Sequence, residues 1–172
     1  EKWLSAIAAG RARASAALLE ESLDWAPGTT AAMAARAGDG WTLTGVKRFV
    51  PWAHVADVGL GPPRSPEGLS LFLVDPKQAG VTLRAMVGID LANRWSEMRL
   101  DGARVGADAV VGAPGTAGPV LDSLLRRAAV CPAAEMPGAA GAGLGMGRGS
   151  GQWGARSGPG SEPRGPGPRG LR

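Results

Sequence analysis

The sequence predicts a mainly β domain, an antiparallel barrel or sandwich, with the end of one helix before it and the start of another after it. Two observations support this prediction. Short apolar segments bounded by Gly, Pro or Asp recur through the middle of the chain, which is typical of antiparallel sheets and barrels. Apolar residues at helical spacing occur instead at both flanks. We therefore divide the chain into residues 1–13, 14–117, 118–136 and 137–172: a helix end, the β-domain, a helix start and a tail.

The N-terminal flank carries Trp3, Leu4 and Ile7 at helical spacing before Gly10 interrupts the pattern. This predicts the last turns of a helix. The next stretch, ASAALLE from Ala14, fits a helix by the propensity of Ala and Leu. It also fits a short buried strand, and periodicity does not separate the two. We assign this stretch to the β-domain.

The β-domain opens with a predicted hairpin. Two β-like runs flank the sequence GDG at residues 38–40, where Asp-Gly supplies the positive φ angles of a tight turn. The segments HVADVGLGPP and GLSLFLVDP then pair around a proline-rich turn, and GVTLRAM, RWSEMRLDGARV and ADAVVG follow. The run from Leu69 to Val74 is apolar on both faces, so it needs cover on both sides. After the strands, one helical face is predicted from Val120, Leu121, Leu124, Leu125 and Ala128.

Length and composition limit the function classes. With 172 residues and 44% apolar content, the chain can form one domain with a core. It begins without Met, shows no leader pattern and has no apolar run near the roughly 20 residues that span a bilayer. We therefore expect a soluble fragment without a membrane partner. The single cysteine, Cys131, has no Cys or His at metal-ligand spacing, so we expect no metal site and a cytoplasmic location.

The basic charge of the chain is concentrated at its C-terminal end. The formal net charge is +4, from 19 basic and 15 acidic residues. Beyond Pro137 there are five arginines and one acid, Glu162, so the rest of the chain is neutral. A neutral body argues against a nucleic-acid-binding face, which needs clustered Lys and Arg. We therefore expect no nucleic-acid partner for the β-domain.

The tail from Gly138 to Arg172 is rich in Gly, Pro and Arg without a period. Such chains lose too much entropy on ordering to pack, so we expect disorder. Three interpretations stay open: an Arg/Gly segment that contacts RNA, a flexible linker, or an out-of-frame reading of GC-rich DNA. The third is favoured because Gly, Pro, Arg and Ala are the residues whose codons begin with two G or C bases.

Five segments occur in an order that resembles a known family. They are ALLEE, GDGWTLTGVKRFVPWAHVADV, GLSLFLVDPKQAGVTL, LDGARVGADAVVG and LLRRAAVCPAAEM. Over nearly all of residues 1–136, they resemble the middle β-domain of the acyl-CoA dehydrogenases, with the helix ends that flank it. The resemblance implies a flavoenzyme of fatty acid metabolism. Such an enzyme holds FAD at the edge of this domain and removes hydrogens from the α and β carbons of an acyl-CoA thioester.

The resemblance also implies two segments that contact the flavin. In the family, the segment matching KRFVP carries an aromatic that packs against the flavin ring and, two residues later, a Thr that hydrogen-bonds near N5. Here these positions hold Phe49 and Pro51. The segment matching ALLEES contributes backbone groups and a Thr hydroxyl, and the hydroxyl is missing here. The candidate cofactor-binding residues are therefore Leu18, Leu19, Phe49, Val50 and Pro51.

Two of these positions leave questions for the structure. Pro51 has neither the hydroxyl nor an N–H, so N5 of the flavin would need another partner. The alternative for Phe49 and Trp52 is that both are core aromatics at a strand end. The only histidine, His54, lacks an orienting group at a position that the family uses for chemistry, so we expect a surface or turn residue. Asp101 reads as a turn acid before Gly102.

No catalytic residue is assigned. The family's base is a Glu in the C-terminal helical domain, and the chain stops before it, so the resemblance implies an incomplete enzyme that is inactive alone. Sequence proximity does not make Glu20, Glu21 or Glu135 the base. Expected partners are an acyl-CoA substrate and other copies or related chains in an oligomer, with Arg126 and Arg127 on a solvated or interfacial helix face. The alternative function is a non-catalytic β-module for binding or assembly. We also expect exposed apolar surface and self-association, because the helical cover is mostly absent.

Overall fold

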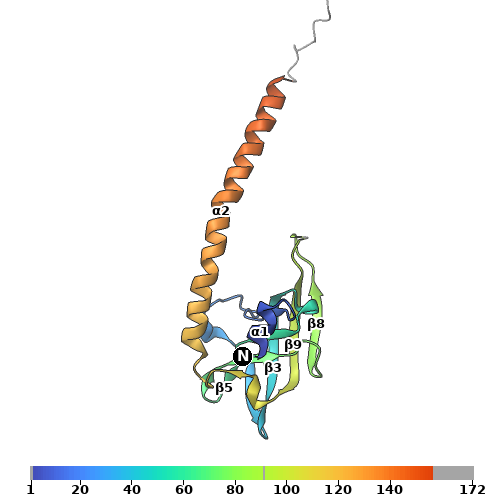
Figure 1. Cartoon of the computed structure of the whole chain (residues 1–172), viewed down its shortest axis with the longest axis vertical. Helices are drawn as coiled ribbons and strands as arrows, with labels where there is room; N and C mark the ends of the chain where they lie inside the picture. Colours follow the sequence, from blue (N-terminus) through green and yellow to red (C-terminus); the bar gives the residue numbers. More distant parts are fainter. Residues whose placement is uncertain (1, 91, 157–172) are drawn as a thin grey trace, which may run out of the picture. The chain divides into compact units, whose positions relative to one another are not determined.

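The computed structural model describes residues 2–90 and 92–156, and its strands form two sheets (Figure 1). Two compact units are present, 1–124 and 125–172. The helices are α1 (Lys2–Ala8) and α2 (Ala117–Arg156), with short 3-10 turns at Pro27–Thr29, Ala53–Val55 and Ala107–Ala109. The strands are β1 (Ala14–Ala16), β2 (Met33–Ala37), β3 (Gly40–Pro51), β4 (Val58–Gly61), β5 (Arg64–Ser65), β6 (Gly68–Leu69), β7 (Leu71–Val74), β8 (Val81–Met86), β9 (Trp95–Val105) and β10 (Val110–Val111).

Within the described residues, ten strands are divided four and six between the two sheets. The order is β1-β4-β7-β10 in one sheet and β6-β5-β2-β3-β9-β8 in the other. Neighbouring strands are antiparallel except for β1 with β4 and β2 with β5. In the described part of the chain neither sheet closes on itself, so the predicted mainly β fold is confirmed as a sandwich and not as a closed barrel.

The main core contains side chains from both sheets. Trp41 of β3 meets Phe72 of β7 edge to face, with ring centroids 5.3 Å apart. Leu43 of β3 and Met98 of β9 are also buried in this cluster. Full burial of a side chain of this size contributes about 1.5–3 kcal/mol. Contacts of this kind hold the two sheets together.

Strand β7 is covered on its inner face and only in part on its outer face. Phe72 and Val74 belong to the main core, whereas Leu71 packs with Ala117 and Leu121 in a second cluster. The start of α2 therefore covers the outer face at Leu71, while Leu73 is only half-buried.

The rest of the predicted apolar face of α2 is not buried. Val120 is 56% exposed and Leu124 is 40% exposed. The helix residues that are buried in the second cluster are Ala117 and Leu121.

The predicted hairpin is present between β2 and β3. Ala37 pairs with Gly40, which leaves Gly38 and Asp39 as the two turn residues. The positive φ angle falls on Gly38, at 63°, and not on the Asp-Gly pair that the sequence suggested. The stretch that helix propensity favoured, from Ala14, forms the short strand β1 instead. Its backbone pairs in parallel with β4, which fixes an extended conformation.

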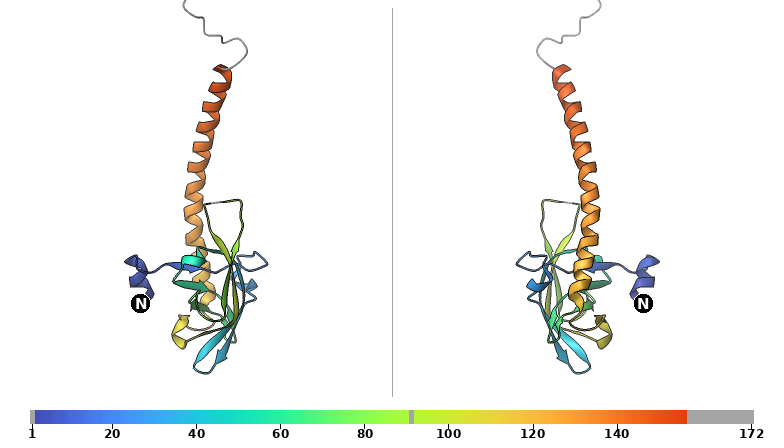
Figure 2. Two further views of the ribbon diagram at one scale, coloured as in Figure 1. Left: turned by 90° about the vertical axis from the view of Figure 1, so that its right-hand side faces the viewer. Right: turned by 90° about the vertical axis from the view of Figure 1, so that its left-hand side faces the viewer.

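Helix α1 lies to the side of the strands and is joined to β1 by residues 9–13 (Figure 2). Helix α2 extends through Arg156, although composition predicts disorder from residue 137. Alanines supply the helix propensity that the many glycines lack, and Pro132 and Pro137 lie within the helix without an N–H to donate. Residues 157–172 of the predicted tail lie outside the described residues. None of the described helices is both long and apolar enough to cross a membrane.

Candidate functional site

A β-bulge near the end of β3 shapes the candidate site. Lys47 pairs with Met98 and Val50 pairs with Ser96, so two residues of β3 lie opposite one residue of β9. The second of these two residues, Phe49, has a φ angle of 51°. Bulges reverse the alternation of side chains and redirect one of them. Here Lys47 and Val50 both become buried, while Phe49 is 38% exposed.

Phe49 forms part of an aromatic surface at the strand end. Its ring meets Trp95 edge to face, with centroids 6.3 Å apart. Trp52 follows with a φ angle of 52° and is 45% exposed, which makes it a second surface ring. The alternative that Phe49 and Trp52 are core aromatics is therefore wrong. A left-handed backbone at two aromatic residues costs free energy, and such strain is typical of functional positions.

The second predicted flavin segment lies beside the first. The backbone N–H of Arg48 donates to the carbonyl of Leu19 at 2.8 Å, which forms an isolated antiparallel bridge. Near the other end, the Ser15 hydroxyl donates to the carbonyl of Pro51 at 2.5 Å. Residues 15–19 and 48–51 are thus joined at both ends. Sequence reasoning proposed the two segments separately, and the fold brings them together.

The five candidate residues differ in what they offer a ligand. Phe49 presents an aromatic surface, and Leu19 is half-buried with its carbonyl engaged by Arg48. The Val50 side chain is fully buried, so only its backbone is available. Leu18 packs against the second core cluster. Pro51 cannot donate a hydrogen bond. The residues therefore fit the apolar face of a flavin ring and supply no donor at Pro51.

A buried ion pair lies directly beneath this site. Lys47 Nζ donates to Glu20 Oε1 at 2.6 Å, with the Lys47 side chain 1% and the Glu20 side chain 9% exposed. Lys47 also donates to the carbonyl of Pro62 at 3.2 Å. The Glu20 carboxylate accepts the backbone N–H groups of Ala31, at 2.7 Å, and Ala32, at 3.2 Å. Every charged atom of the pair thus has a partner, as burial of charge requires.

Burial and hydrogen bonding oppose each other at Glu20. Burial acts to raise the pKa of the carboxyl, but the hydrogen bonds from Lys47, Ala31 and Ala32 outweigh it and hold the pKa below the ordinary value of about 4.5. Burial lowers the pKa of Lys47, and Glu20 offsets part of that effect. Glu20 is therefore ionised at neutral pH and remains so into the acid range.

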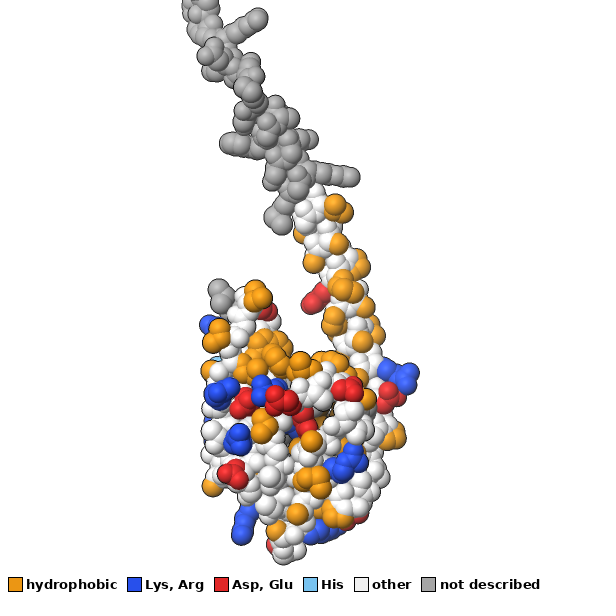
Figure 3. Space-filling view, turned by 180° about the vertical axis from the view of Figure 1, so that it is seen from behind, with side chains coloured by type: hydrophobic (Ala, Val, Ile, Leu, Met, Phe, Trp, Pro, Cys, Tyr) orange, Lys and Arg blue, Asp and Glu red, His pale blue; other side chains and the backbone are white. Residues whose placement is uncertain are grey.

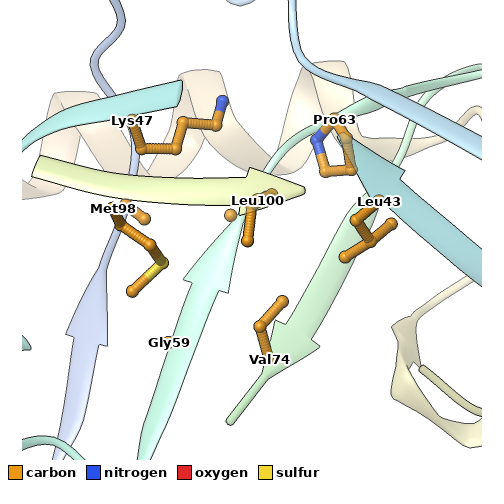
Figure 4. A pocket seen from close by; sticks show the side chains of 9 residues that line it. Leu43, Lys47, Gly59, Pro63, Val74, Met98 and Leu100 are labelled. Carbon is orange, nitrogen blue, oxygen red and sulfur yellow. The ribbon is translucent and has the colours of Figure 1, made fainter. Parts of the chain in front are cut away.

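The Lys47 side chain also lines a small cavity in the core. Figure 4 shows its ammonium on the side of the stem away from Met98 and Val74. The cavity is about 10 Å³, which is near the minimum for one water molecule. It is lined by apolar side chains and glycines besides Lys47. A space of this size admits at most one water molecule, so the pair can influence a ligand only through the segments that it joins.

Arg48 connects both segments to β9 at the surface. Its guanidinium lies 3.1 Å from Glu21 Oε2 and 3.6 Å from Glu97 Oε2. Glu97 also lies 3.9 Å from Arg84. Among the described residues, Arg48 Nε is the one buried side-chain polar atom without a hydrogen-bond partner. The carboxylates beside the site are therefore engaged by cations.

The ion pair was not found from the sequence, although a signal for it exists. Lys47 has the same parity along β3 as the core residues Trp41 and Leu43. A charged residue at a core-facing position needs a buried partner. Glu20, in an apolar stretch, is the carboxylate that meets this need.

His54 lies beside the aromatic surface. It is exposed in the 3-10 turn after Trp52, as predicted, and its ring centroid lies 6.0 Å from that of Trp52. Asp101 was expected in a turn and lies instead within β9, beside a second bulge at Gly102. No group of three or more potential metal-ligating side chains occurs among the residues that the structure describes.

An apolar groove of about 580 Å³ lies between α1 and the outer face of the four-stranded sheet. Hydrophobic side chains also gather elsewhere on the surface, next to a band of charged residues (Figure 3). The groove carries carboxylates and no basic residue. Its walls include Trp3, Ile7, Leu60, Leu73, Asp75 and Asp108.

No protein-family model matches the chain. The acyl-CoA dehydrogenase IpdE1 of Mycobacterium tuberculosis is 37% identical over 84 residues, which cover 45% of this chain and 22% of that protein. The glutaryl-CoA dehydrogenase of Mycobacterium smegmatis in complex with FADH2 superimposes with a TM-score of 0.63 at 30% identity. The ChsE4–ChsE5 complex of Mycobacterium tuberculosis gives a TM-score of 0.61 at 31% identity. Each structural match covers 70% of this chain and about a third of the other.

The strand unit therefore has a fold like that of part of these dehydrogenases. The chain is similar to acyl-CoA dehydrogenases, and it spans between 22% and 32% of the length of the relatives named above.

Proposed function

We propose that this chain is the flavin-edge strand domain of an FAD-dependent acyl-CoA dehydrogenase. The observation that carries the proposal is the pairing of Leu19 with Arg48, which places the two expected flavin segments side by side. The exposed Phe49 ring on this joined surface supports it. The substrate class is an acyl-CoA thioester that undergoes α,β-dehydrogenation.

When bound, FAD would supply the hydride acceptor for this reaction. Phe49 would pack against the flavin ring, and the Trp95 ring beside it restricts the orientation of Phe49. Backbone groups at Leu18, Leu19 and Val50 would face the polar edge of the ring. Pro51 leaves one position without a donor, so the electronic environment of the flavin differs there from that of a site with a Thr.

We further propose that these residues do not catalyse the reaction by themselves. A general base must be available to take a proton. Glu20 is buried with Lys47 and cannot reach a substrate, and Glu21 and Glu97 pair with Arg48 at the surface. We infer that another part of the intact enzyme supplies the base for α-proton abstraction.

The test is a titration of the purified chain with FAD, followed by flavin fluorescence and visible absorbance. We expect a colourless purified protein with weak, saturable FAD binding, because one strand domain supplies only part of the ring contacts. Phe49→Asn should weaken binding at least tenfold. The control Met33→Asn, at an exposed position of β2, should not. Absence of saturable binding, or binding indifferent to Phe49, would refute the flavin role, and a stoichiometric bound flavin would refute its weakness.

A second candidate function is a non-catalytic module for partner assembly, favoured by the apolar groove beside α1. In this case the groove, and not the aromatic surface, carries the activity. The chain would then assemble with copies of itself or with a related chain. Substitution of Leu73 by Lys in the groove would abolish assembly and leave FAD binding unchanged. The flavin proposal predicts the opposite for Phe49→Asn, which should weaken FAD binding and leave assembly unchanged.

A further inference from the structure

We propose that Lys47 and Glu20 are positioning residues for the flavin edge: together they hold residues 18–19 against the β3 bulge and close the loop formed by residues 21–30. The inference rests on the proposed function for its link to flavin. It concerns residues that no ligand can touch, because the Lys47 side chain is 1% and the Glu20 side chain 9% exposed. They can act only through the segments that they join.

One carboxylate collects donors from separate parts of the chain. Glu20 accepts from Lys47 on β3 and from the N–H groups of Ala31 and Ala32, which precede β2. Lys47 in turn reaches the carbonyl of Pro62 after β4. Segments that are distant in sequence therefore converge on a single buried pair.

The position of Glu20 determines what this convergence does. It directly follows Leu19, whose carbonyl accepts the N–H of Arg48 at 2.8 Å. Lys47 directly precedes Arg48. The ion pair and the backbone bridge are thus adjacent links between the same two segments, one buried and one beside the aromatic surface. Loss of the Lys47–Glu20 ion pair would leave the hydrogen bond between Arg48 and Leu19 as the main link that holds residue 19 against β3.

The same carboxylate also closes the loop of residues 21–30. The loop begins immediately after Glu20 and ends at Ala31, whose N–H is 2.7 Å from Glu20 Oε2. It carries Leu23, with a φ angle of 54°, and Trp25, which are 52% and 57% exposed. The loop starts at Glu21, which is paired with Arg48 next to Phe49. We call the Lys47–Glu20 pair, with the Ala31 and Ala32 N–H groups that it binds, the clasp. The clasp therefore determines where these exposed side chains lie relative to the aromatic surface.

Charge makes this clasp stronger than a neutral hydrogen bond. Charge-assisted bonds are shorter and roughly twice as strong as neutral ones, and the Lys47–Glu20 distance of 2.6 Å is at the short end. Removal of one partner leaves the other charged group buried without compensation. Replacement of both by neutral groups of similar shape removes that penalty but not the need for a tether. Stability and positioning can therefore be separated by mutation.

The experiment compares Lys47→Met, Glu20→Gln and the double variant with the unmodified full-length chain. The matched control is Arg36→Met with Glu67→Gln, an ion pair of 2.9 Å whose side chains are 60% and 39% exposed. Three quantities are measured: the urea midpoint, the exchange rates of the Ala31, Ala32 and Arg48 amides, and the dissociation constant for FAD.

We expect the single variants to lower the urea midpoint and the double variant to restore most of it. In the double variant, exchange at Ala32 and Arg48 should stay at least tenfold faster than in the unmodified chain, and FAD affinity should stay at least tenfold weaker. The Arg36→Met, Glu67→Gln control should leave the urea midpoint nearly unchanged, and it should change the exchange rates and the dissociation constant less than twofold. If the single variants fail to fold, the double variant decides alone.

Two results would overturn the inference. One is a double variant with native amide protection at both positions. The other is loss of protection spread over all strands in proportion to global stability, which marks a purely structural pair. If the unmodified chain binds no FAD, the proposed function fails, and the exchange rates still decide whether the clasp positions these segments.

Discussion

Glu20 combines a buried carboxylate with a lowered pKa, so it links stability to pH. A group whose folded pKa is depressed contributes stability above its unfolded pKa, and this stability is lost as the pH falls through the folded pKa. The window for Glu20 therefore begins near pH 4.5 and extends downward. Asp57, Glu67 and Asp90 also have a lowered pKa. Their protonation lowers stability in the same acid range, so the effect of Glu20 is obtained as the difference between the unmodified chain and a Glu20 variant.

The prediction for Glu20→Gln has two parts. At pH 7 the variant should lose about 3–5 kcal/mol, because Lys47 is left buried without its counter-charge. Between pH 4.5 and 3 its stability should then fall less steeply than that of the unmodified chain. Urea titrations at pH 7, 5, 4 and 3 measure both effects. If the free energy of unfolding fell equally steeply with pH in both proteins, Glu20 would not titrate as its contacts require.

Gly45 illustrates how closely the backbone approaches itself beside the clasp. Its φ angle is 150°, and an added Cβ would lie 2.6 Å from Cβ of Ala32 and 2.8 Å from its Cα. Gly45→Ala should therefore destabilise the fold by about 1–3 kcal/mol through overpacking and strain. Gly118→Ala is the control, since nothing lies within 4 Å of its Cβ in helix α2. Chemical unfolding should show no loss for the control, and equal losses would contradict the steric explanation.

At the scale of the element, the bulge in β3 gives the two phenylalanines of the chain different environments. Phe72 is fully buried, whereas Phe49 is 38% exposed in a left-handed conformation. Phe72→Ala should cost about 3–5 kcal/mol. Phe49→Asn should change stability by less than about 1 kcal/mol, because Asn tolerates a positive φ and the lost ring is half in solvent. Thermal unfolding of both variants measures the contrast, and a large loss at Phe49 would mean that its ring supports the core.

The outer part of helix α2 is the least supported element by its own burial. Side chains from Arg126 to Gly145 are exposed, and isolated helices owe little stability to propensity when Gly and Pro recur. Trypsin should therefore cut first at Arg126 or Arg127 or beyond them. Lys47, which is buried in β3, should be cut last. Mass spectrometry of early digestion products tests this order, and early cleavage inside β3 would contradict it.

The sequence predicted elements better than it predicted contacts between them. Alternation and turn residues located the β2–β3 hairpin and the β4–β7 pair correctly, because both signals are local. The sequence left a barrel and a sandwich as alternatives, because sheet closure depends on pairings that no local pattern encodes, and the structure shows the sandwich. The bulge at Phe49 was missed for a similar reason. It is visible only as a register difference against β9.

The candidate site was predictable to a similar extent. Resemblance supplied Leu19 and Phe49 as separate segments, and only the fold shows that they are neighbours. The Lys47–Glu20 pair joins residues 27 positions apart. The signal in the sequence is a charged residue at a position of β3 that faces the core. This indicates that a buried partner exists, but it does not identify the partner. A partner of this kind requires tertiary structure to identify.

At the scale of the whole molecule, the exposed apolar surface predicts self-association. The groove beside α1 is about 580 Å³ and is walled by Trp3, Ile7, Leu60 and Leu73. On α1, Leu4 is 73% and Ile7 38% exposed, and large apolar patches on soluble monomers mark sites of association. The purified chain should therefore form dimers or larger species in a concentration-dependent manner, and it should bind a dye that reports exposed apolar surface.

Substitution tests whether the groove is the cause of association. Leu4→Lys with Ile7→Lys should shift the mass measured by light scattering toward the monomer and reduce dye fluorescence, because two ammonium groups would have to be desolvated on association. Thr82→Lys adds charge on an exposed position of β8 and should change neither quantity. A monodisperse monomer without dye binding in the unmodified chain would contradict the prediction. It would mean that the groove is closed in solution, with α1 packed more tightly on the four-stranded sheet.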